Sequence, residues 1–326
     1  MRILVTGGAG YIGSVVADHL LRAGHTVTVL DNLIMGWREA VPAEAEFVQA
    51  DIGDQAALDQ LFTTHRFDAV MHFAALIEAG ESVKVPERYF DNNSLRTLTL
   101  LRVMLQHGVS RFVFSSTAAV YGEPGTIPIP EDHALSPTNA YGESKLIVEQ
   151  MLAWLQRAHG LRYASLRYFN AAGATPDRGE AHRSESHLIP LILQVPLGQR
   201  EFIAIQGTDY PTKDGTCIRD FVHIDDLASA HLLALQGLET HDTLICNLGS
   251  GEGFSVRQIV ELARKVTGHP IPVREMPRRT GDPAVLIASS DKIRRLLGWD
   301  PQHSDVESII ASAWQWHKSH PRGYRT

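Results

Sequence analysis

Two side chains four residues apart suggest acid–base chemistry. Tyr141 and Lys145 stand in the segment AYGESK, within a stretch from about 139 to 158 whose apolar residues recur at helical spacing. Residues i and i+4 share a helix face, so we expect the ammonium to lie beside the phenol and to lower its pKa. A phenolate at Tyr141 can remove a proton from a substrate hydroxyl while a hydride leaves the same carbon. An amphipathic, solvent-facing pair is the alternative for so common a spacing.

A hydroxyl-rich segment supplies a third group. Residues 115–122, SSTAAVYG, overlap the end of the apolar run RFVFSS (111–116). Thr117 falls just past this predicted strand, where its hydroxyl can bond both a substrate oxygen and Tyr141, because ligands of open α/β sheets bind beyond the carboxyl ends of strands. Ala118 and Ala119 follow and cannot transfer protons. The set can move a hydride and one proton but cannot also eliminate water.

A glycine-rich turn precedes these groups in the chain. VTGGAGYIG follows the first apolar strand and opens a helix, and Gly7, Gly10 and Gly13 permit a close approach of pyrophosphate to the helix N-terminus. An ordinary strand-to-helix turn is the alternative for the glycines alone. Asp31 ends the second strand about twenty residues further on, where an acid accepts ribose hydroxyls and repels a 2′-phosphate. The pattern predicts NAD rather than NADP, with Lys145 donating to the nicotinamide ribose.

The third predicted strand also ends in a candidate cofactor contact. In ADI, residues 50–52, Asp51 is placed to accept from the adenine amino group, and Ile52 to give an apolar contact. The alternative is that Asp51 only caps the next helix.

The order of these segments predicts an α/β fold. Short β-branched runs at 2–6, 26–30, 46–50, 69–73, 111–116 and 162–168 alternate with helical patterns, which is typical of βαβ units and a Rossmann-type doubly wound parallel sheet. We expect an NAD-binding domain at 1–170 that also receives part of 220–245. Prolines and glycines become frequent beyond it, so 171–326 is expected to form a smaller mixed α/β lobe. Within 220–235 we expect a strand and a helix capped by Asp225 or Asp226.

Composition excludes several classes of protein. The 326 residues carry a formal charge of −7, so general affinity for nucleic acid or anionic membranes is not expected. No run has the length of a signal segment or a membrane span, and Cys217 and Cys246 give no disulfide framework. We therefore expect a soluble cytoplasmic protein. No His-Glu-x-x-His spacing occurs, and no metal is predicted.

The ordered motifs resemble a known family. VTGGAGYIG, LDN, ADI, HFAA, DNN, FSSTAAVYG, YGESK and RYFNAAGA together look like the extended short-chain dehydrogenase/reductases. DYPTKDGTCIRDFVHIDDLA, NLGSG and PRRTGDPA are similar to the UDP-glucose 4-epimerases within it, over nearly the whole chain. The resemblance implies tightly held NAD, a smaller nucleotide-sugar-binding lobe and a homodimer formed through two helices of the larger lobe.

The resemblance also implies roles for individual residues. Thr117, Tyr141 and Lys145 match the catalytic positions. Cofactor-binding positions match Gly7, Gly10, Tyr11, Ile12, Gly13, Asp31, Asn32, Asp51, Ile52, Phe73, Ala74, Ala75, Asn92, Ser115, Lys145 and Tyr168. Substrate-binding positions match Thr117, Tyr141, Asn170, His187, Leu188, Arg219, Arg279 and Asp282. The two arginines match those that neutralise a UDP diphosphate, and Asp282 matches the acid at the uridine ribose. Without the family pattern, an Arg219–Asp220 ion pair and a solvated Arg279 are the alternatives.

Three positions depart from the family pattern. Ile77 replaces a frequent lysine, Gln206 replaces an aromatic residue beside the uracil, and His187 replaces an asparagine. Affinity and base preference depend on how these losses are compensated. Leu286 falls at the position that gates the hexose pocket, and its intermediate size predicts a preference for unacetylated sugars.

The implied reaction is reversible 4-epimerisation of UDP-hexoses such as UDP-galactose and UDP-glucose, an isomerase activity that proceeds by transient hydride transfer to NAD and a 4-keto sugar. A 4-epimerase of another UDP-sugar, either an N-acetylhexosamine or a uronic acid, is the first alternative. A non-catalytic NAD-sensing regulator is a second alternative, and it would be expected to lose Tyr141 or Lys145. A 4,6-dehydratase is disfavoured because Ala118 and Ala119 replace its acids.

Overall fold

Seven strands of the computed structural model, which describes residues 1–279 and 281–325, form one sheet in the order β11-β6-β5-β4-β1-β2-β3. The strands pair β3-β2, β2-β1, β1-β4 and β4-β5 in parallel. The doubly wound sheet expected from the sequence is confirmed. In chain order the strands are β1 (Arg2–Thr6), β2 (Thr26–Asp31), β3 (Glu46–Gln49), β4 (Ala69–His72), β5 (Arg111–Thr117), β6 (Arg162–Tyr168) and β11 (Thr243–Leu248).

The order of the strands reverses at β1. This strand lies between β2 and β4, so the chain first builds outward to β3 and then returns to the other side of β1. At such a switch point the connections leave the sheet in opposite directions, and a crevice opens at the carboxyl ends of the two central strands. The glycine-rich turn after β1 and the HFAA segment after β4 both lie at this point of the sheet.

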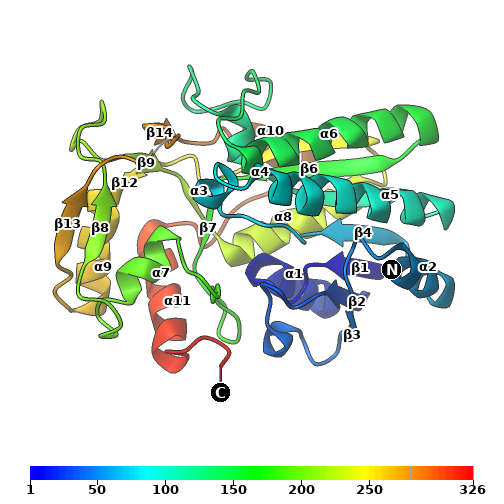
Figure 1. Cartoon of the computed structure of the whole chain (residues 1–326), viewed down its shortest axis with the longest axis horizontal. Helices are drawn as coiled ribbons and strands as arrows, with labels where there is room; N and C mark the ends of the chain where they lie inside the picture. The colour runs from blue at the N-terminus through cyan, green and yellow to red at the C-terminus, as the bar shows by residue number, and fades with distance from the viewer. Residues whose placement is uncertain (280, 326) are drawn as a thin grey trace. The chain divides into compact units, whose positions relative to one another are not determined.

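Both faces of the sheet are apolar, and helices cover both of them. α2, α5 and α6 share one buried cluster with Leu4, Leu30 and Phe112 of the sheet, and α5 and α6 run side by side (Figure 1). Ile3 and Val5, which flank Leu4 in β1, point to the opposite face of the sheet and are also fully buried. The helices associated with this sheet are α1 (Tyr11–Arg22), α2 (Gln55–Thr64), α3 (Ala79–Ser82), α4 (Pro86–Tyr89), α5 (Arg96–Gln106), α6 (Ala140–His159) and α8 (Ile224–Gly237).

Three short helical turns connect these elements. A π-helical turn, η2 (Phe90–Leu95), joins α4 to α5, and two 3₁₀ turns, η1 (Arg38–Ala40) and η3 (Ala118–Tyr121), follow β2 and β5. π-Helical turns inside helices frequently occur at functional sites. η2 contains the DNN segment that the sequence marked as a site candidate.

The chain divides into two units, each made of several stretches. The first contains residues 1–120, 137–167 and 228–246, and the second contains 121–136, 168–227 and the described residues from 247 onward. The segment 121–136 therefore belongs to the second unit, although it lies between two stretches of the first. The assignment of cofactor binding to 1–170 and of sugar binding to 171–326 stays a prediction.

The second unit is built from short strands around a helical core. α7, α9 and α11 share a buried cluster with Ile203 and Phe221 of two of the strands. Its strands are β7 (Asn170–Ala172), β8 (Ile203–Gln206), β9 (Ile218–Arg219), β10 (Phe221–His223), β12 (Phe254–Ser255), β13 (Val273–Met276) and β14 (Val285–Leu286). Its helices are α7 (Leu188–Leu193), α9 (Val256–Thr267), α10 (Asp291–Leu297) and α11 (Val306–Ser319).

One predicted helix cap is wrong. α8 begins at Ile224, so Asp225 and Asp226 lie inside its first turn rather than at its N-cap. The Asp226 carboxylate instead accepts from the backbone N–H groups of Gln302 and His303 at 2.8 and 2.9 Å. The acid therefore ties α8 to a distant loop, which sequence spacing alone does not reveal.

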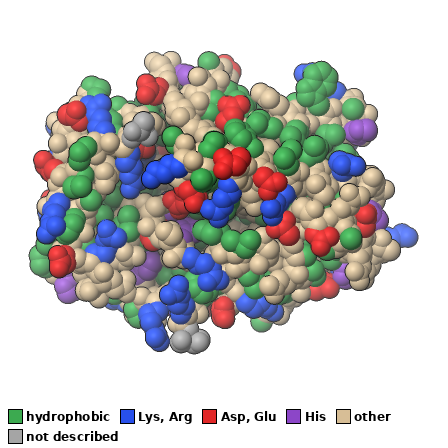
Figure 2. Space-filling model, viewed as in Figure 1, with side chains coloured by type: hydrophobic (Ala, Val, Ile, Leu, Met, Phe, Trp, Pro, Cys, Tyr) green, Lys and Arg blue, Asp and Glu red, His purple; other side chains and the backbone are tan. Residues whose placement is uncertain are grey.

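Charged side chains of both signs occur on the surface that can be seen in Figure 2. Figure 2 shows acidic and basic side chains interspersed over the face in view. Among the helices described, none combines the length and the apolar character needed to span a bilayer.

Candidate active site

Tyr141 and Thr117 meet where α6 begins and β5 ends. Asn139 caps α6 by accepting from the backbone N–H of Gly142 at 2.9 Å, and Thr117 is the last residue of β5, one residue later than predicted for the strand. A side-chain hydrogen bond joins Thr117 to Tyr141. A Cβ on Gly142 would come within 2.7 Å of the Ala119 carbonyl oxygen, so a glycine there allows α6 to approach η3 closely. The predicted hydroxyl–phenol contact is present.

The pKa of Tyr141 does not move in the direction that the sequence suggested. Burial raises it above the ordinary value for a phenol, and the charge of Glu78 raises it further. The hydrogen bond from Thr117 acts in the opposite sense and does not outweigh burial. The expected lowering by Lys145 is therefore wrong for the protein alone, because removal of the phenol from water is the larger effect.

Lys145 is almost fully buried, with 2% of its surface exposed. Its ammonium donates to the carbonyl oxygen of Ser115 at 2.8 Å and lies 4.9 Å from the centre of the Phe114 ring. Burial lowers the pKa of Lys145 from 10.5 to about 7. The structure thus brings Ser115, Thr117, Tyr141 and Lys145 together at the end of β5, and excludes the solvent-facing alternative for Lys145.

A buried asparagine that the sequence did not single out holds this region together. The Asn93 Oδ1 accepts from the backbone N–H of Leu76 at 2.8 Å and from the side chain of Asn92 at 2.9 Å. Its Nδ2 donates to the Leu76 carbonyl and to the Ser144 hydroxyl, both at 3.0 Å. Asn93 therefore fastens the segment after β4 to α6. The doubled asparagine in DNN was the available signal, but it did not tell which of the two is buried.

The glycine-rich turn has the geometry that a dinucleotide needs. Gly7 has φ +73°, and a Cβ there would lie 2.4 Å from the Ala74 backbone nitrogen. A Cβ on Gly13 would lie 2.3 Å from the Gly7 carbonyl oxygen. α1 begins at Tyr11, and its N-cap, Gly10, provides no capping side chain. No capping side chain covers the start of α1, and the first N–H groups of a helix are the usual partners of a pyrophosphate.

Asp31 and Asp51 occupy the ends of neighbouring strands. Asp31 accepts from the backbone N–H groups of Ala9 and Leu33 at 3.0 and 2.8 Å, and burial raises its pKa. Each oxygen of its carboxylate retains further lone pairs for a ribose. Asn32, predicted as a neighbour of the cofactor, donates to Asp51 at 2.9 Å and so joins the two strand ends.

The alternative role considered for Asp51 is excluded. The cap of α2 is Asp54, whose carboxylate accepts from the backbone N–H of Ala57. Asp51 instead forms an ion pair with Arg96 at 2.8 Å. Burial alone would raise the pKa of Asp51, but hydrogen bonds from Gly53 and Asn32 and the Arg96 charge lower it. The ion pair joins residues 45 positions apart, and sequence analysis did not find it.

The remaining predicted cofactor positions lie at the carboxyl ends of strands or near them. Phe73, directly after β4, donates its backbone N–H to the Thr6 carbonyl at 2.8 Å, and Ala74 and Ala75 follow it. Ile52 is buried beside the Asp51 turn, and Ile77 is partly buried in the segment held by Asn93. Tyr168 is buried at the end of β6.

In the second unit, the predicted diphosphate arginines are not used in internal ion pairs. Among the described residues, neither Arg219 nor Arg279 lies within ion-pair distance of an acid, and both act electrostatically on Cys217. The Asp220 carboxylate accepts from the N–H groups of Ser250 and Gly251 at 2.7 and 3.0 Å. The suggested Arg219–Asp220 pair is therefore excluded, while the exposure of Arg279 agrees with the solvated alternative as well as with ligand binding.

Other predicted substrate positions lie on several short strands of the second unit or next to them. Leu286 pairs with Arg219 across β14 and β9, and Asn170 donates to the Asp220 carbonyl at 2.8 Å. Asp282 acts electrostatically on Tyr210 and Cys217. Gln206 ends β8 opposite Met276 of β13.

Tyr210 is a candidate that sequence analysis missed. It is 5% exposed, and its hydroxyl is buried with no hydrogen-bond partner among the described residues. The Arg278 guanidinium lies 4.1 Å from its ring centre. A buried hydroxyl next to the charges of Arg219 and Asp282 is expected to meet a polar ligand group.

His187 directly precedes α7 and belongs to a compact group with Glu180 and Glu185. Its Nδ1 lies 3.0 Å from Glu180 Oε1 and 2.9 Å from Glu185 Oε1. Burial alone would lower the pKa of His187, but the two carboxylates raise it well above its ordinary value. Leu188 begins α7. Of this group, sequence analysis singled out only His187, although acids and histidines alternate closely in GEAHRSESH.

Comparison with known proteins places these sites in a family. A model described as the NAD dependent epimerase/dehydratase family matches residues 3–249. The chain belongs to this family.

Several members of the NAD dependent epimerase/dehydratase family resemble this chain over its full length. The UDP-glucose 4-epimerase of Halalkalibacterium halodurans is 55% identical over 329 residues, which cover 100% of this chain and 98% of that protein. A crystal structure of UDP-glucose 4-epimerase has a TM-score of 0.97 at 50% identity and full coverage of both chains. The Bifidobacterium longum enzyme in complex with NAD+ and UDP has a TM-score of 0.96 at 35% identity, with coverage of 99% and 100%.

Proposed function

We propose that this chain catalyses the reversible 4-epimerisation of UDP-hexoses, interconverting UDP-galactose and UDP-glucose with NAD as a recycled cofactor. The observation that carries the proposal is the joint position of Thr117, Tyr141 and Lys145 at the end of β5, in one unit with the glycine-rich turn. Full-length relatives at 50–55% identity bear the name UDP-glucose 4-epimerase and support it.

The cofactor is held by backbone and acids of the first unit. Gly7 and Gly13 let backbone segments pack too closely for any side chain, and α1 begins without a capping side chain, which leaves its N-terminus for a pyrophosphate. Asp31 accepts the ribose hydroxyls, and its charge disfavours a 2′-phosphate. When bound, NAD accepts the C4 hydride and returns it to the opposite face of the sugar.

Tyr141 and Thr117 handle the proton of the 4-hydroxyl. Tyr141 removes this proton as the sugar C4 becomes a carbonyl, and returns it when the carbonyl is reduced. Thr117 bonds the substrate oxygen and the phenol, which keeps the proton path short. Lys145, poised near neutrality by burial, donates to the nicotinamide ribose and stabilises the phenolate when charged.

Residues of the second unit are proposed to grip UDP rather than the hexose. Arg219 and Arg279 supply local positive charge to the diphosphate on a chain whose total charge is −7. Asn170, His187 and Leu188 complete this grip, and Asp282 accepts from the uridine ribose. The reaction requires the 4-keto sugar to turn over between the two hydride transfers, so firm binding must be confined to the nucleotide.

The pattern beside Thr117 favours epimerisation over dehydration. Ala118 and Ala119 form the start of η3 and offer no group that can transfer a proton to or from C5 or C6. A chain that eliminates water needs acids there, and their absence leaves hydride and single-proton transfer.

The assignment is tested by Tyr141→Phe. Loss of the phenol proton acceptor should reduce interconversion of UDP-galactose and UDP-glucose by about 10²- to 10⁴-fold while NAD content stays near that of the wild type. Tyr163→Phe is a matched control, because it removes a buried tyrosine hydroxyl on β6 outside the proposed site. Near-normal turnover by Tyr141→Phe would contradict the proposal.

Sugar preference is proposed to depend on Leu286. Its intermediate bulk is expected to admit glucose and galactose more readily than their N-acetylated forms. Initial rates on UDP-glucose, UDP-galactose and the two UDP-N-acetylhexosamines test this preference, and equal kcat/KM values on all four would contradict it.

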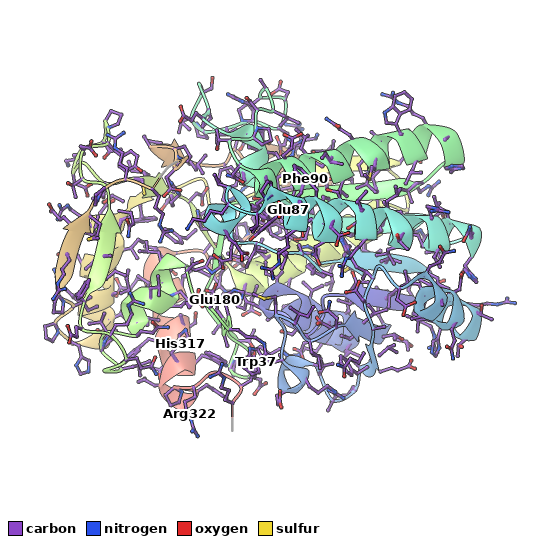
Figure 3. The ribbon with its side chains drawn as sticks, in the orientation of Figure 1. Trp37, Glu87, Phe90, Glu180, His317 and Arg322 are labelled. Carbon is purple, nitrogen blue, oxygen red and sulfur yellow. The ribbon has the colours of Figure 1, made fainter. Side chains whose placement is uncertain are left out.

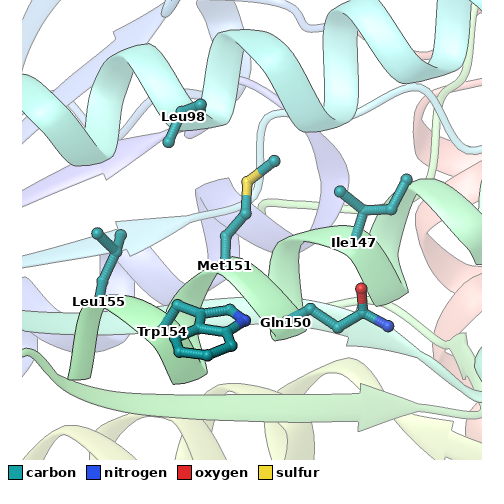
Figure 4. Close-up of a pocket in the computed structure, with 6 residues that line it drawn as sticks. All are labelled: Leu98, Ile147, Gln150, Met151, Trp154 and Leu155. Carbon is teal, nitrogen blue, oxygen red and sulfur yellow. The ribbon is translucent and has the colours of Figure 1, made fainter. Parts of the chain in front are cut away.

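We also propose a homodimer formed through α5 and α6. A groove of about 330 Å³ lies on these helices. Figure 4 shows the residues that line it, which are Leu98, Ile147, Gln150, Met151, Trp154 and Leu155. Trp154 of this groove is 67% exposed, a degree of apolar exposure that a two-fold contact between identical faces would remove. Met151→Glu should convert a dimer to a monomer by light scattering after size exclusion, and an unchanged mass would contradict this interface.

The site of action is proposed to be the cytoplasm. Cys217 and Cys246 are both buried and neither forms a disulfide, which agrees with a reducing compartment. Fractionation of the native host tests this placement, and recovery in an extracellular fraction would contradict it.

A further inference from the structure

A group of four metal-ligand side chains lies in the second unit, on the segment that leads into α7. Glu180, His182, Glu185 and His187 each offer one ligand atom, and these atoms all lie within 4.8 Å of one another. Glu180 Oε1 is 3.2 Å from His182 Nε2 and 3.0 Å from His187 Nδ1, and Glu185 Oε1 is 2.9 Å from the same Nδ1. We refer to these residues as the Glu/His cluster.

The two negative carboxylates of the cluster, Glu180 and Glu185, require two compensating positive charges. The Glu180 and Glu185 side chains are only 6% and 9% exposed, and buried carboxylates are stable only when their charge is compensated. Either two protons on the imidazoles or one divalent cation between two neutral imidazoles supplies that compensation. The cation has the advantage of satisfying four ligand atoms from one centre.

The donor set and its dimensions favour zinc. Two imidazole nitrogens and two carboxylate oxygens are a combination that Zn²⁺ accepts in tetrahedral geometry, with bonds of about 2.0–2.2 Å. Such bonds place ligand atoms about 3.3–3.5 Å apart. Three of the separations in the cluster are 2.9–3.2 Å, a few tenths of an ångström shorter than this, and the others extend to at most 4.8 Å. The side chains must therefore rotate to bring all four ligand atoms around one ion.

The surroundings of the cluster already orient its ligands. Glu185 Oε1 also accepts from the backbone N–H groups of Ser186 and His187 at 2.9 and 2.8 Å. The His182 and His187 rings lie 4.9 Å apart, centre to centre. Preorganised ligands of this kind lose little freedom on metal binding. The His187 side chain is 39% exposed, which leaves a route of entry from solvent.

The cluster lies against the C-terminal helix α11. A Cβ on Gly179 would meet the Trp316 ring at 2.2 Å, and the Gly179 N–H donates to the Tyr324 hydroxyl at 3.1 Å. The charges of Glu180 and Glu185 act on the pKa of His317 in α11, raising it against the larger lowering by burial. Figure 3 shows Glu180 beside this helix. An ion held by four residues of the segment would therefore stiffen a loop that packs on α11 and leads directly into α7.

We propose that Glu180, His182, Glu185 and His187 bind one Zn²⁺, which holds the loop before α7 in its folded form. All four ligands belong to the second unit, and none belongs to the reacting set of Thr117, Tyr141 and Lys145, although His187 is also a proposed contact of UDP. The ion acts as a structural clip and takes no part in hydride or proton transfer.

The test is a zinc titration of full-length protein that has been freed of metal with a chelator. Calorimetry should give about one site per chain with a Kd below about 1 µM, and Zn²⁺ should raise the thermal midpoint. Glu180→Gln and His182→Gln should each weaken binding about 100-fold and abolish the thermal shift. His107→Gln is the matched control, because its partner Asp59, 3.2 Å away, forms a two-residue pair without further ligands.

Three results would overturn the proposal. The first is an absence of stoichiometric zinc binding by the wild type. The second is a zinc affinity of His182→Gln equal to that of the wild type. The third is a loss of zinc affinity in His107→Gln as large as that in the cluster variants. If either cluster variant fails to fold, zinc X-ray absorption on the wild type still decides, because the proposal requires four nitrogen and oxygen ligands including two imidazoles. A spectrum with sulfur ligands or with no imidazole scattering contradicts it.

Discussion

The buried ammonium of Lys145 should make the stability of this protein depend on pH. Its pKa falls from 10.5 to about 7 because folding removes it from water. Each pKa unit corresponds to about 1.4 kcal/mol, so burial of the charged form costs at most about 5 kcal/mol. A lysine whose folded pKa lies below its unfolded value imposes this cost fully below the folded pKa. The cost then disappears as the pH rises toward the unfolded pKa.

Lys145→Met isolates this contribution. Between pH 7 and pH 9 the unfolded lysine carries a proton that the folded one has lost, so wild-type stability should gain about 1.4 kcal/mol per pH unit over the variant. From pH 6 to pH 9 the free energy of unfolding of the wild type, relative to Lys145→Met, should rise by about 2–3 kcal/mol. The lost hydrogen bond to the Ser115 carbonyl adds an offset that does not vary with pH.

The assay is urea unfolding of nucleotide-free protein at pH 6, 7, 8 and 9, because bound NAD would add its own stabilisation. Lys84→Met, at an exposed lysine of the same unit, is the control and should differ from the wild type by an amount that does not change with pH. A wild-type-to-Lys145→Met difference that is constant from pH 6 to pH 9, or that shifts in favour of the variant as pH rises, would refute the argument.

Three further predictions concern the cofactor site and the core. Gly13→Ala places a Cβ 2.3 Å from a backbone carbonyl and should reduce bound NAD in the purified protein at least about tenfold, whereas Gly125→Ala, which meets nothing within 4 Å, should leave it unchanged. Asp31→Ala should weaken NAD binding and narrow its advantage over NADP, as measured by fluorescence titration; an unaltered NAD/NADP ratio would count against the role of Asp31. Glu149→Gln breaks a 2.6 Å ion pair with Arg167 whose side chains are 5% and 3% exposed, and should lower the free energy of unfolding by about 3–5 kcal/mol; a loss under about 1 kcal/mol would contradict this.

The sheet could be predicted because its signals are local. Each of the six predicted runs is a strand, and the helix expected from 139 to 158 is α6 at Ala140–His159. Apolar alternation and turn residues determine such elements over a few neighbouring positions. The family, the fold and the use of NAD, inferred from motifs in a fixed order, are confirmed by the comparisons and the strand order.

Features that depend on distant residues were not accessible from the sequence. Asp226 binds a loop 76 residues away, so the predicted cap of α8 was wrong, and the pairing of Asp51 with Arg96 excludes the capping role considered as its alternative. The pKa of Tyr141 rises because burial outweighs a favourable neighbour, and the extent of burial is a property of the folded chain.

Among the candidate site residues, too, those with a local signal could be predicted and those defined by distant contacts could not. Tyr141 and Thr117 were proposed from the sequence because each stands at a recognisable element boundary, and the structure shows the contact between them. Asn93 and Tyr210 were missed because their significance is a buried hydrogen-bonding group, which neighbouring letters do not specify. The roles carried over by resemblance, including those of Arg219 and Asp282, stay predictions until variants are measured.

The most direct test of the proposed reaction follows the hydrogen on C4. Purified protein is incubated with UDP-glucose deuterated at C4, and the UDP-galactose formed is analysed by mass spectrometry and proton NMR. Hydride transfer to a bound cofactor and back predicts that deuterium remains on C4 of the product with inverted configuration and does not exchange with water. Loss of the label to solvent, or no formation of UDP-galactose by NAD-containing protein, would contradict the account.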